Sequence, residues 1–508
     1  MHIHTPVRIL TAALLLAGGV PIARCEVRLP GLLSSHMVLQ REKPIHVWGW
    51  SDPGEKITIE LHGVTRSTSG SSTGSWSVFL PPEPAGGPFQ LTVSGGNNKI
   101  VLDDVLIGDV WFASGQSNME MPVKGFTGAP VKNSAEEIAH ATQPQIRLIN
   151  FPHKAIDFPQ RNVDAHWTLC TPETAADFSA AAYFFGRELN AREHVPVGLI
   201  DATWGGTPAE AWVSLPSIST DAALMPIFGT RAEMMQSQAD NEAILAAERR
   251  EDEAARKAGK TPPSHPWRPD PASWAPAWLF NGMVAPATPY GIKGVIWYQG
   301  ESNSRAVFAP MYARLFPALI ADWRTQWHEG DFPFLFVQIA NFKSNDGEWW
   351  AVIREAQRRT LSVANTAMVV TTDIGDPDNV HPADKQTVGA RLALAARALA
   401  YGEKVEYSGP SFRQAAPEGE AMRVWFDHAG GLTAKGDMLQ GFEIAGSDGR
   451  FVAATARVDG GTVVVSSAKV GDPKYVRYGW ANAPVINLFN AEGLPASPFT
   501  SQDAIPGR

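Results

Sequence analysis

Two segments of this 508-residue chain combine residue types that could carry out nucleophilic catalysis. The first, Gly115-Gln116-Ser117-Asn118-Met119, follows an apolar run at 105–113, so Ser117 would lie just beyond the carboxyl end of a strand. A serine there becomes a nucleophile when a base activates it, although a loop serine is more often a helix cap. The second, Asp378-Asn379-Val380-His381, offers a base, because histidine accepts protons near neutral pH. An aspartate three residues earlier can fix the tautomer of the ring; the alternative is a capping Asp beside a surface His.

Two further segments could stabilise a developing negative charge. In Trp204-Gly205-Gly206-Thr207, the absence of a side chain lets a backbone N–H approach a reacting oxyanion, although an ordinary Gly-Gly turn fits equally well. In the segment 297–303, Gln299 or Asn303 could donate an amide hydrogen bond to the same oxyanion. Each signal alone is weak, but all four segments follow predicted strands, so they would meet on one edge of a sheet.

The elements that must position these residues follow from the hydrophobic pattern. Short apolar runs lie at 105–113, 146–149, 197–200, 295–298, 334–339 and 368–372, and helical stretches lie at 180–190, 311–326, 351–363 and 385–400. Strands that alternate with helices predict an α/β fold, with a parallel sheet and helices on both faces. Ligands of such sheets bind beyond the carboxyl ends of the strands.

The segments on either side have a different pattern. Alternating apolar and polar residues, separated by Gly-, Pro- and Asn-rich turns, predict a β-sandwich-like domain at 26–104. The catalytic domain would span 105–402, and a C-terminal β-rich segment would span 403–508. Within the catalytic domain, a charged Ala-rich stretch at 231–260 and a Pro- and Trp-rich run at 262–278 predict a helical excursion. We expect a surface helix and loop there rather than a wall over the active site.

Composition narrows the class of protein. The net charge of −9 disfavours a nucleic-acid groove, which needs clustered Lys and Arg. Only two cysteines, Cys25 and Cys170, are present, so a zinc cluster or a thiol nucleophile is not expected. Residues 1–25 read as a signal peptide, because a weakly basic start precedes an apolar run at 9–18 that is too short to span a membrane. The protein is therefore expected to be exported, periplasmic or secreted, without a membrane span.

Several segments together resemble one known family. They are Met37-Val38-Leu39-Gln40, Trp48-Gly49-Trp50, 108–120, 204–212, 294–303, 354–357 and 378–382. They are similar to the sialate O-acetylesterase family of carbohydrate esterases, within the SGNH hydrolase group, whose parallel sheet is flavodoxin-like. The resemblance implies a Ser–His–Asp triad of Ser117, His381 and Asp378. It also implies an oxyanion hole from the N–H of Ser117, a glycine of the second segment and an amide of the third. Gly205 is chosen over Gly206, and Gln299 stands where the SGNH group typically has Asn.

The resemblance implies an enzyme that removes acetyl groups from sugar hydroxyls through an acetyl-enzyme, with no metal or organic cofactor. Its partner would be an O-acetylated glycan. A sialate carboxylate would favour a dedicated arginine, for which Arg354 is one candidate. The 17 tryptophans, several of them near the motifs, instead suit stacking on neutral glycans such as acetylated xyloglucan or xylan. Trp204, Glu301 and Asn303 are further possible substrate-binding residues.

Two other classes compete with this interpretation. A glycan-binding protein with a vestigial esterase site would not need a complete set of Ser117, His381 and Asp378. A long-chain lipase would need a wide apolar acyl pocket, whereas these loops are rich in Gly, Asn and Trp.

Overall fold

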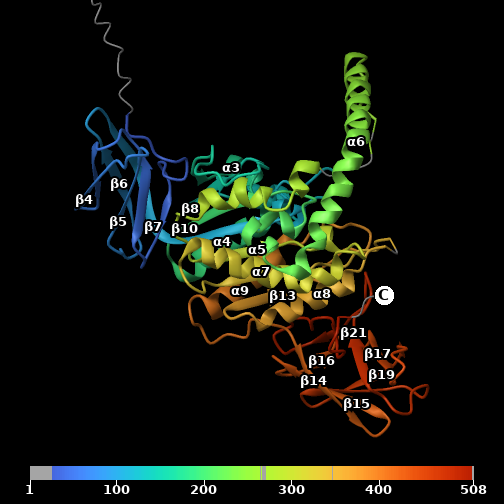
Figure 1. Cartoon of the computed structure of the whole chain (residues 1–508). Helices are drawn as coiled ribbons and strands as arrows, with labels where there is room; N and C mark the ends of the chain where they lie inside the picture. The colour runs from blue at the N-terminus through green and yellow to red at the C-terminus, as the bar shows by residue number, and fades with distance from the viewer. Residues whose placement is uncertain (1–25, 264, 266–269, 346, 506–508) are drawn as a thin grey trace, which may run out of the picture.

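The chain folds into a central α/β unit with a β-rich unit on either side of it (Figure 1). The structure is a computed structural model that describes residues 26–263, 265, 270–345 and 347–505. The predicted signal peptide lies outside the described residues. The N-terminal and C-terminal β units lie at opposite ends of the central unit, so they do not form one common sandwich.

The central unit is built on a mainly parallel sheet. Its strands run in the order β13-β12-β11-β7-β10-β8-β9, and every neighbouring pair is parallel except β8 with β9. The bounds of these strands are β7 Lys99–Gly115, β8 Gln143–Asn150, β9 Thr168–Cys170, β10 Val197–Thr203, β11 Gly294–Tyr298, β12 Phe334–Val337 and β13 Thr366–Val369. Because the parallel strands end on the same edge, the loops that follow β7, β10, β11 and β13 are brought together there.

Helices cover both faces of this sheet, as the sequence predicts. In β7, Val110 and Phe112 point into one buried apolar cluster, and Trp111 and Ala113 point into another on the opposite face. The first face packs against α7 and α8, and the second packs against α4 and α9. The helices are α1 Ser117–Glu120, α2 Ser134–Ala139, α3 Pro172–Ala176, α4 Ala180–Glu193, α5 Leu215–Ser219, α6 Pro226–Lys257, α7 Ala309–Trp327, α8 Trp350–Arg359 and α9 Lys385–Leu399. The excursion expected near 231–260 is α6, which projects away from the body of the molecule in Figure 1.

The N-terminal β unit shares a strand with the central sheet. The first part of β7 pairs with β6, and its later residues pair with β10 and β11. The boundary predicted between residues 104 and 105 therefore falls inside one continuous strand. The other strands of this unit are β1 Val38–Gln40, β2 Ile45–Trp50, β3 Lys56–Leu61, β4 Val64–Ser69, β5 Ser75–Leu80 and β6 Gly86–Ser94.

The C-terminal β unit has an apolar core of its own, centred on residues such as Val424, Ile444 and Phe499. Two four-stranded sheets, β14-β15-β20-β19 and β18-β17-β21-β23, and a two-stranded sheet, β16-β22, enclose this core. Their bounds are β14 Ser411–Glu418, β15 Ala421–Asp427, β16 Thr433–Ala434, β17 Phe442–Ala445, β18 Val452–Ala453, β19 Thr455–Asp459, β20 Thr462–Ser466, β21 Tyr475–Tyr478, β22 Leu488–Phe489 and β23 Phe499–Thr500.

Candidate active site

Ser117 stands where β7 turns into α1. Gly115 makes this turn possible, because its φ of 137° is unfavourable for other residues and an added Cβ would lie 2.2 Å from the carbonyl oxygen of Tyr298. Ser117 is the first residue of the short helix α1, where backbone N–H groups have no acceptor within the helix. The serine is thus held at the carboxyl edge of the sheet. The N–H groups of Gln116, Met119 and Glu120 donate to backbone carbonyls, whereas that of Ser117 has no acceptor among the described residues.

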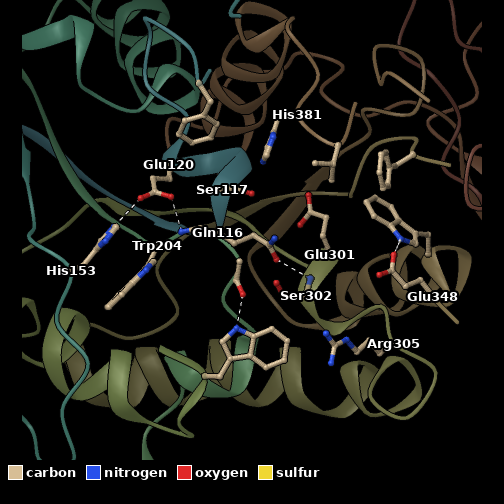
Figure 2. A pocket seen from close by; sticks show the side chains of 17 residues that line it. Gln116, Ser117, Glu120, His153, Trp204, Glu301, Ser302, Arg305, Glu348 and His381 are labelled. Atoms are coloured by element: carbon tan, nitrogen blue, oxygen red, sulfur yellow. Dashed lines mark hydrogen bonds and ion pairs between the residues drawn. The ribbon is translucent and has the colours of Figure 1, made fainter. Parts of the chain in front are cut away.

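A pocket of about 660 Å³ opens at this edge, and we call it the central pocket. Figure 2 shows Ser117 and His381 facing each other across it. The remaining lining residues come from the loops after several strands and from the segments between them: Gln116, Glu120, Phe126, His153, Trp204, Gly205, Gly206, Trp274, Glu301, Ser302, Arg305, Phe342, Glu348, Trp350 and Val380. The structure therefore brings the candidate nucleophile and the candidate base, which are far apart in sequence, into one cavity.

His381 is neutral at physiological pH in this environment. Burial and, to a smaller extent, the positive charge of Lys385 lower the pKa of its imidazole, and Glu120 opposes them; the net result is a pKa of about 4. Its Nε2 is buried and has no hydrogen-bond partner among the described residues. A neutral imidazole with a free nitrogen can accept a proton, which is what a general base requires.

Asp378 does not occupy the position predicted for it. Its carboxylate is 78% exposed and accepts a hydrogen bond from Nζ of Lys343 at 2.9 Å. Within the described part of the chain it forms no hydrogen bond with His381, whose own N–H donates to Oδ1 of Asn379 at 3.0 Å. In this geometry Asp378 does not fix the tautomer of the histidine.

Of the two candidate glycines, Gly205 lies against the serine. A Cβ added to Gly205 would lie 3.3 Å from Cβ of Ser117. The Gly205 N–H donates to Oε2 of Glu120 at 2.6 Å, so it already binds a negatively charged oxygen inside the pocket. Gly206 instead presents its carbonyl oxygen, which accepts a hydrogen bond from Nε1 of Trp274 at 2.7 Å.

Neither amide of the third segment reaches the pocket. Nε2 of Gln299 donates to the carbonyl of Thr207 at 3.2 Å and to Oδ1 of Asn303 at 2.7 Å, and its Oε1 accepts from the hydroxyl of Tyr312 at 2.9 Å. Nδ2 of Asn303 donates to Glu210 at 2.8 Å. Gln299 is fully buried. The prediction that Gln299 is an oxyanion donor is therefore wrong, because both of its N–H groups already have acceptors. Asn303 does not bind substrate either, since its amide is committed to the same buried network.

The prediction that Arg354 binds substrate is also wrong. It is fully buried and donates to four backbone carbonyls, those of Ile339, Ala340, Ala481 and Asn482, at 2.7–2.9 Å. Its guanidinium fastens the C-terminal β unit to the central unit and is not available to a carboxylate. Trp204 and Glu301, in contrast, do line the pocket.

Several pocket residues were missed by sequence reasoning. Nε2 of His153 lies 2.8 Å from Oε1 of Glu120, and its ring stacks on Trp204 at a centroid distance of 4.3 Å. Oε1 of Gln116 accepts from the N–H of Ser302 at 3.1 Å and so joins the loop after β7 to the loop after β11. Gln116 and Glu120 belong to the serine motif and could have been noticed there. Nothing in the sequence marks His153, which comes from an irregular segment.

The run at 262–278 also contributes to the site. Trp274, in the short helix η3 (Pro271–Trp274), forms part of the pocket wall, and the guanidinium of Arg305 lies 5.3 Å from the centre of its ring. The expectation of a surface loop is wrong for this residue, because its hydrogen bond to Gly206 draws the indole against the active-site loops.

A buried polar chain lies behind the serine. Nζ of Lys385 donates to Oδ1 of Asn118 at 2.6 Å, and Nδ2 of Asn118 donates to Oε1 of Glu301 at 2.7 Å and to the carbonyl of Val380 at 3.0 Å. Burial lowers the pKa of Lys385 to about 7 and raises the pKa of Glu301. Asn118 follows Ser117 and Val380 precedes His381, so this chain sets the distance between the loops that carry the two candidate catalytic residues.

The site has the parts of a serine hydrolase, namely a serine and a neutral histidine in one pocket at the carboxyl edge of a parallel sheet. A family model described as carbohydrate esterase, sialic acid-specific acetylesterase, matches residues 267–398. The sialate O-acetylesterase of Rattus norvegicus is 31% identical, with 94% of this chain and 94% of that protein covered, and the human one is 33% identical over 75% and 73%. A carbohydrate acetylesterase from Xanthomonas citri has a crystal structure that matches with a TM-score of 0.81 at 37% identity, covering 94% of this chain and all of that one.

The chain belongs to the sialate O-acetylesterase family of carbohydrate esterases. It is accordingly a serine-type carboxylic-ester hydrolase, and the resemblance seen in the sequence is confirmed. None of the helices in the described residues is both long and apolar enough to cross a membrane.

Proposed function

We propose that this enzyme removes acetyl groups from sugar hydroxyls, with Ser117 as nucleophile and His381 as general base. The observation that carries the proposal is that Ser117 and a neutral His381 line the same pocket in a chain of the carbohydrate esterase family. His381 takes the proton of the Ser117 hydroxyl as Oγ attacks the acetyl carbonyl, and it returns that proton to the departing sugar oxygen. Water activated by the same imidazole then attacks the acetyl-enzyme and releases acetate.

The proposed oxyanion donors are the N–H groups of Ser117 and Gly205. The carboxylate of Glu120 supports this assignment, because one of its oxygens already occupies an anion-binding position beside Gly205 and Ser117. An incoming acetyl oxygen would displace it. His153, which is paired with Glu120 and stacked on Trp204, is placed to hold the displaced carboxylate nearby.

Asp378 is proposed as the acid that orients His381 once substrate is bound. It lies three residues before the histidine, and hydrogen bonds between catalytic groups often tighten only in the substrate complex. Its present partner, Lys343, is 65% exposed, and an exposed ion pair is worth only about 0–1 kcal/mol. A movement of this loop that broke the ion pair of Asp378 with Lys343 and formed a hydrogen bond between Asp378 and His381 would therefore cost little.

We assign the central sheet to the flavodoxin-like SGNH type. When β7, β10, β11, β12 and β13 are numbered 1 to 5 in chain order, their order across the sheet is 2-1-3-4-5, which defines a flavodoxin-like sheet. β8 is an addition beyond β10. Ser117 then follows the first strand of the sheet.

A neutral sugar suits the pocket better than an anionic one. Three carboxylates, those of Glu120, Glu301 and Glu348, line it together with aromatic rings that can stack on a sugar. One specific observation favours sialate as the second candidate. Arg305 is the only Arg or Lys among the described lining residues, it is exposed, and it could bind a carboxylate.

Acetate release decides between these substrates. The enzyme should hydrolyse 4-nitrophenyl acetate and release acetate from acetylated xylan or xyloglucan oligosaccharides faster than from O-acetylated sialic acid. Arg305→Ala should leave kcat/KM for the neutral substrates unchanged. If sialate is the natural substrate, this variant will selectively lower kcat/KM for O-acetylated sialic acid. Glycan binding without any ester turnover would instead support the binding-protein alternative. We also propose that the enzyme acts outside the cytoplasm, on the strength of the apolar run at 9–18 in its sequence.

A further inference from the structure

A second cavity adjoins the central pocket where the C-terminal β unit meets the central unit. This side pocket has a volume of about 630 Å³, within the range of about 300–1,000 Å³ that is typical of ligand sites. Trp349 and Glu348 contribute from the central unit, and Phe451, Arg477 and Trp480 contribute from the C-terminal unit. None of these residues takes part in the catalytic steps proposed above.

The two pockets are neighbours that share one lining residue. Glu348 lines both, Trp349 lines the side pocket and Trp350 lines the central pocket. Nε1 of Trp350 donates to Oε2 of Glu348 at 3.0 Å, so the carboxylate is held on the border between the two (Figure 2). A ligand longer than one sugar unit that entered the central pocket on this side would reach the side pocket next.

The side pocket is rigidly built. Arg354 binds the carbonyls of Ala481 and Asn482, and Asn482 in turn accepts from the N–H of Trp350 at 3.2 Å and donates to the carbonyl of Glu348 at 3.1 Å. These bonds fix Trp480, the neighbouring residue, relative to the active-site loop. A preformed surface binds a ligand with a smaller loss of conformational entropy than a mobile one.

The chemistry of its walls suits an uncharged sugar. The guanidinium of Arg477 lies 4.1 Å from the ring centre of Phe451 and 5.8 Å from that of Trp480, and its charge is balanced by Glu443 at 2.7 Å. The walls therefore combine aromatic rings, one face of Phe451 being covered by the guanidinium, with polar groups, and the charge of the one lining cation, Arg477, is paired. A pyranose ring is matched to such a surface, since it has apolar C–H faces and hydroxyls around its edge.

We propose that the side pocket is a subsite for the further sugar units of a neutral oligosaccharide whose acetylated unit lies in the central pocket. The proposal rests on the proposed esterase function and adds that the natural substrate is a glycan chain rather than a single sugar. The C-terminal β unit then selects the substrate as well as completing the fold.

The test compares chain lengths. We expect kcat/KM of the wild-type enzyme to be at least about tenfold higher for acetylated xylo- or cellohexaose than for acetylated xylose or glucose. Trp480→Ala should remove this preference and leave kcat/KM for 4-nitrophenyl acetate unchanged. Phe451→Ala is the second variant, in case Trp480→Ala does not fold. Trp425→Ala, which changes a partly exposed tryptophan of the same β unit outside the side pocket, should behave as wild type.

Equal kcat/KM for single sugars and hexaoses in the wild type would overturn the subsite, and so would an equal loss on all substrates in Trp480→Ala. Preference for a sialylated oligosaccharide over the neutral ones would overturn its neutral character. Calorimetry with unacetylated hexaoses separates the subsite from the esterase proposal. If no sugar ester is hydrolysed but hexaoses bind to the wild type and not to Trp480→Ala, the esterase proposal fails and the subsite stands. If hexaoses do not bind to the wild type, the subsite fails.

Discussion

Gln299 provides a sharp test of the buried network beneath the active site. In the structure Gln299 links two loops, whereas the sequence predicts that it is an oxyanion donor. Gln299→Met removes all amide hydrogen bonds while keeping a similar volume, so it isolates the contribution of those bonds. Gln299→Ala adds a cavity and should be worse.

The size of the effect follows from the groups left behind. Without the amide, the carbonyl of Thr207 and Oδ1 of Asn303 each lose a donor. The hydroxyl of Tyr312 loses its acceptor at 2.9 Å. A buried polar group that loses its partner costs about 1–3 kcal/mol, and the Tyr312 hydroxyl keeps a longer contact of 3.3 Å to the Gln299 carbonyl. We expect Gln299→Met to lower the free energy of unfolding by about 2–4 kcal/mol.

Urea unfolding, followed by tryptophan fluorescence, measures the stability, and 4-nitrophenyl acetate measures the turnover. Because Gln299 lies outside the pocket, kcat of the folded variant should fall by less than about tenfold. An oxyanion donor would behave in the opposite way, with unchanged stability and a loss of about a hundred- to a thousandfold in kcat. That second result would refute our interpretation of the network.

Three further predictions concern the catalytic residues. Ser117→Ala should lower turnover on the order of a million-fold. It should not lower stability, because the Ser117 side chain has no hydrogen bond among the described residues, and a variant that kept a tenth of the activity would exclude Ser117 as the nucleophile. The kcat/KM for 4-nitrophenyl acetate should rise with pH through about 4, as His381 loses its proton, and stay level towards pH 7. Lys385→Met removes a charge that lowers the pKa of His381, so it should move the rising limb to higher pH; a limb that did not move would point to another base. Asp378→Asn should lower kcat by about ten-thousandfold if Asp378 orients the histidine, while Lys343→Met should change it little; a loss below tenfold in Asp378→Asn would show that His381 works without this acid.

The sheet and the location of its functional edge could be predicted from local sequence patterns. The alternation of apolar runs with helical stretches, which places strands such as 295–298 and helices such as 385–400, reflects local burial patterns that persist in the folded protein. Ser117 and His381 both lie in short, distinctive motifs, Ser117 two residues after β7 and His381 in the longer loop between β13 and α9. The resemblance of these motifs to one family was likewise a property of the sequence alone.

Which polar side chains face the pocket depends on contacts between segments that are far apart in the chain. Gln299 and Arg354 carry the right chemistry, but their positions depend on how α7, α8 and the C-terminal unit pack against the sheet, and these contacts join residues far apart in the chain. The pocket is also lined by residues from irregular segments that have no periodic signal, namely His153, Trp274 and Arg305. The sequence also did not show that β7 continues through the boundary predicted at residue 104, because the strand changes its pairing partners there without any change in local pattern. Long-range packing and hydrogen-bond satisfaction, rather than residue type, assign these roles.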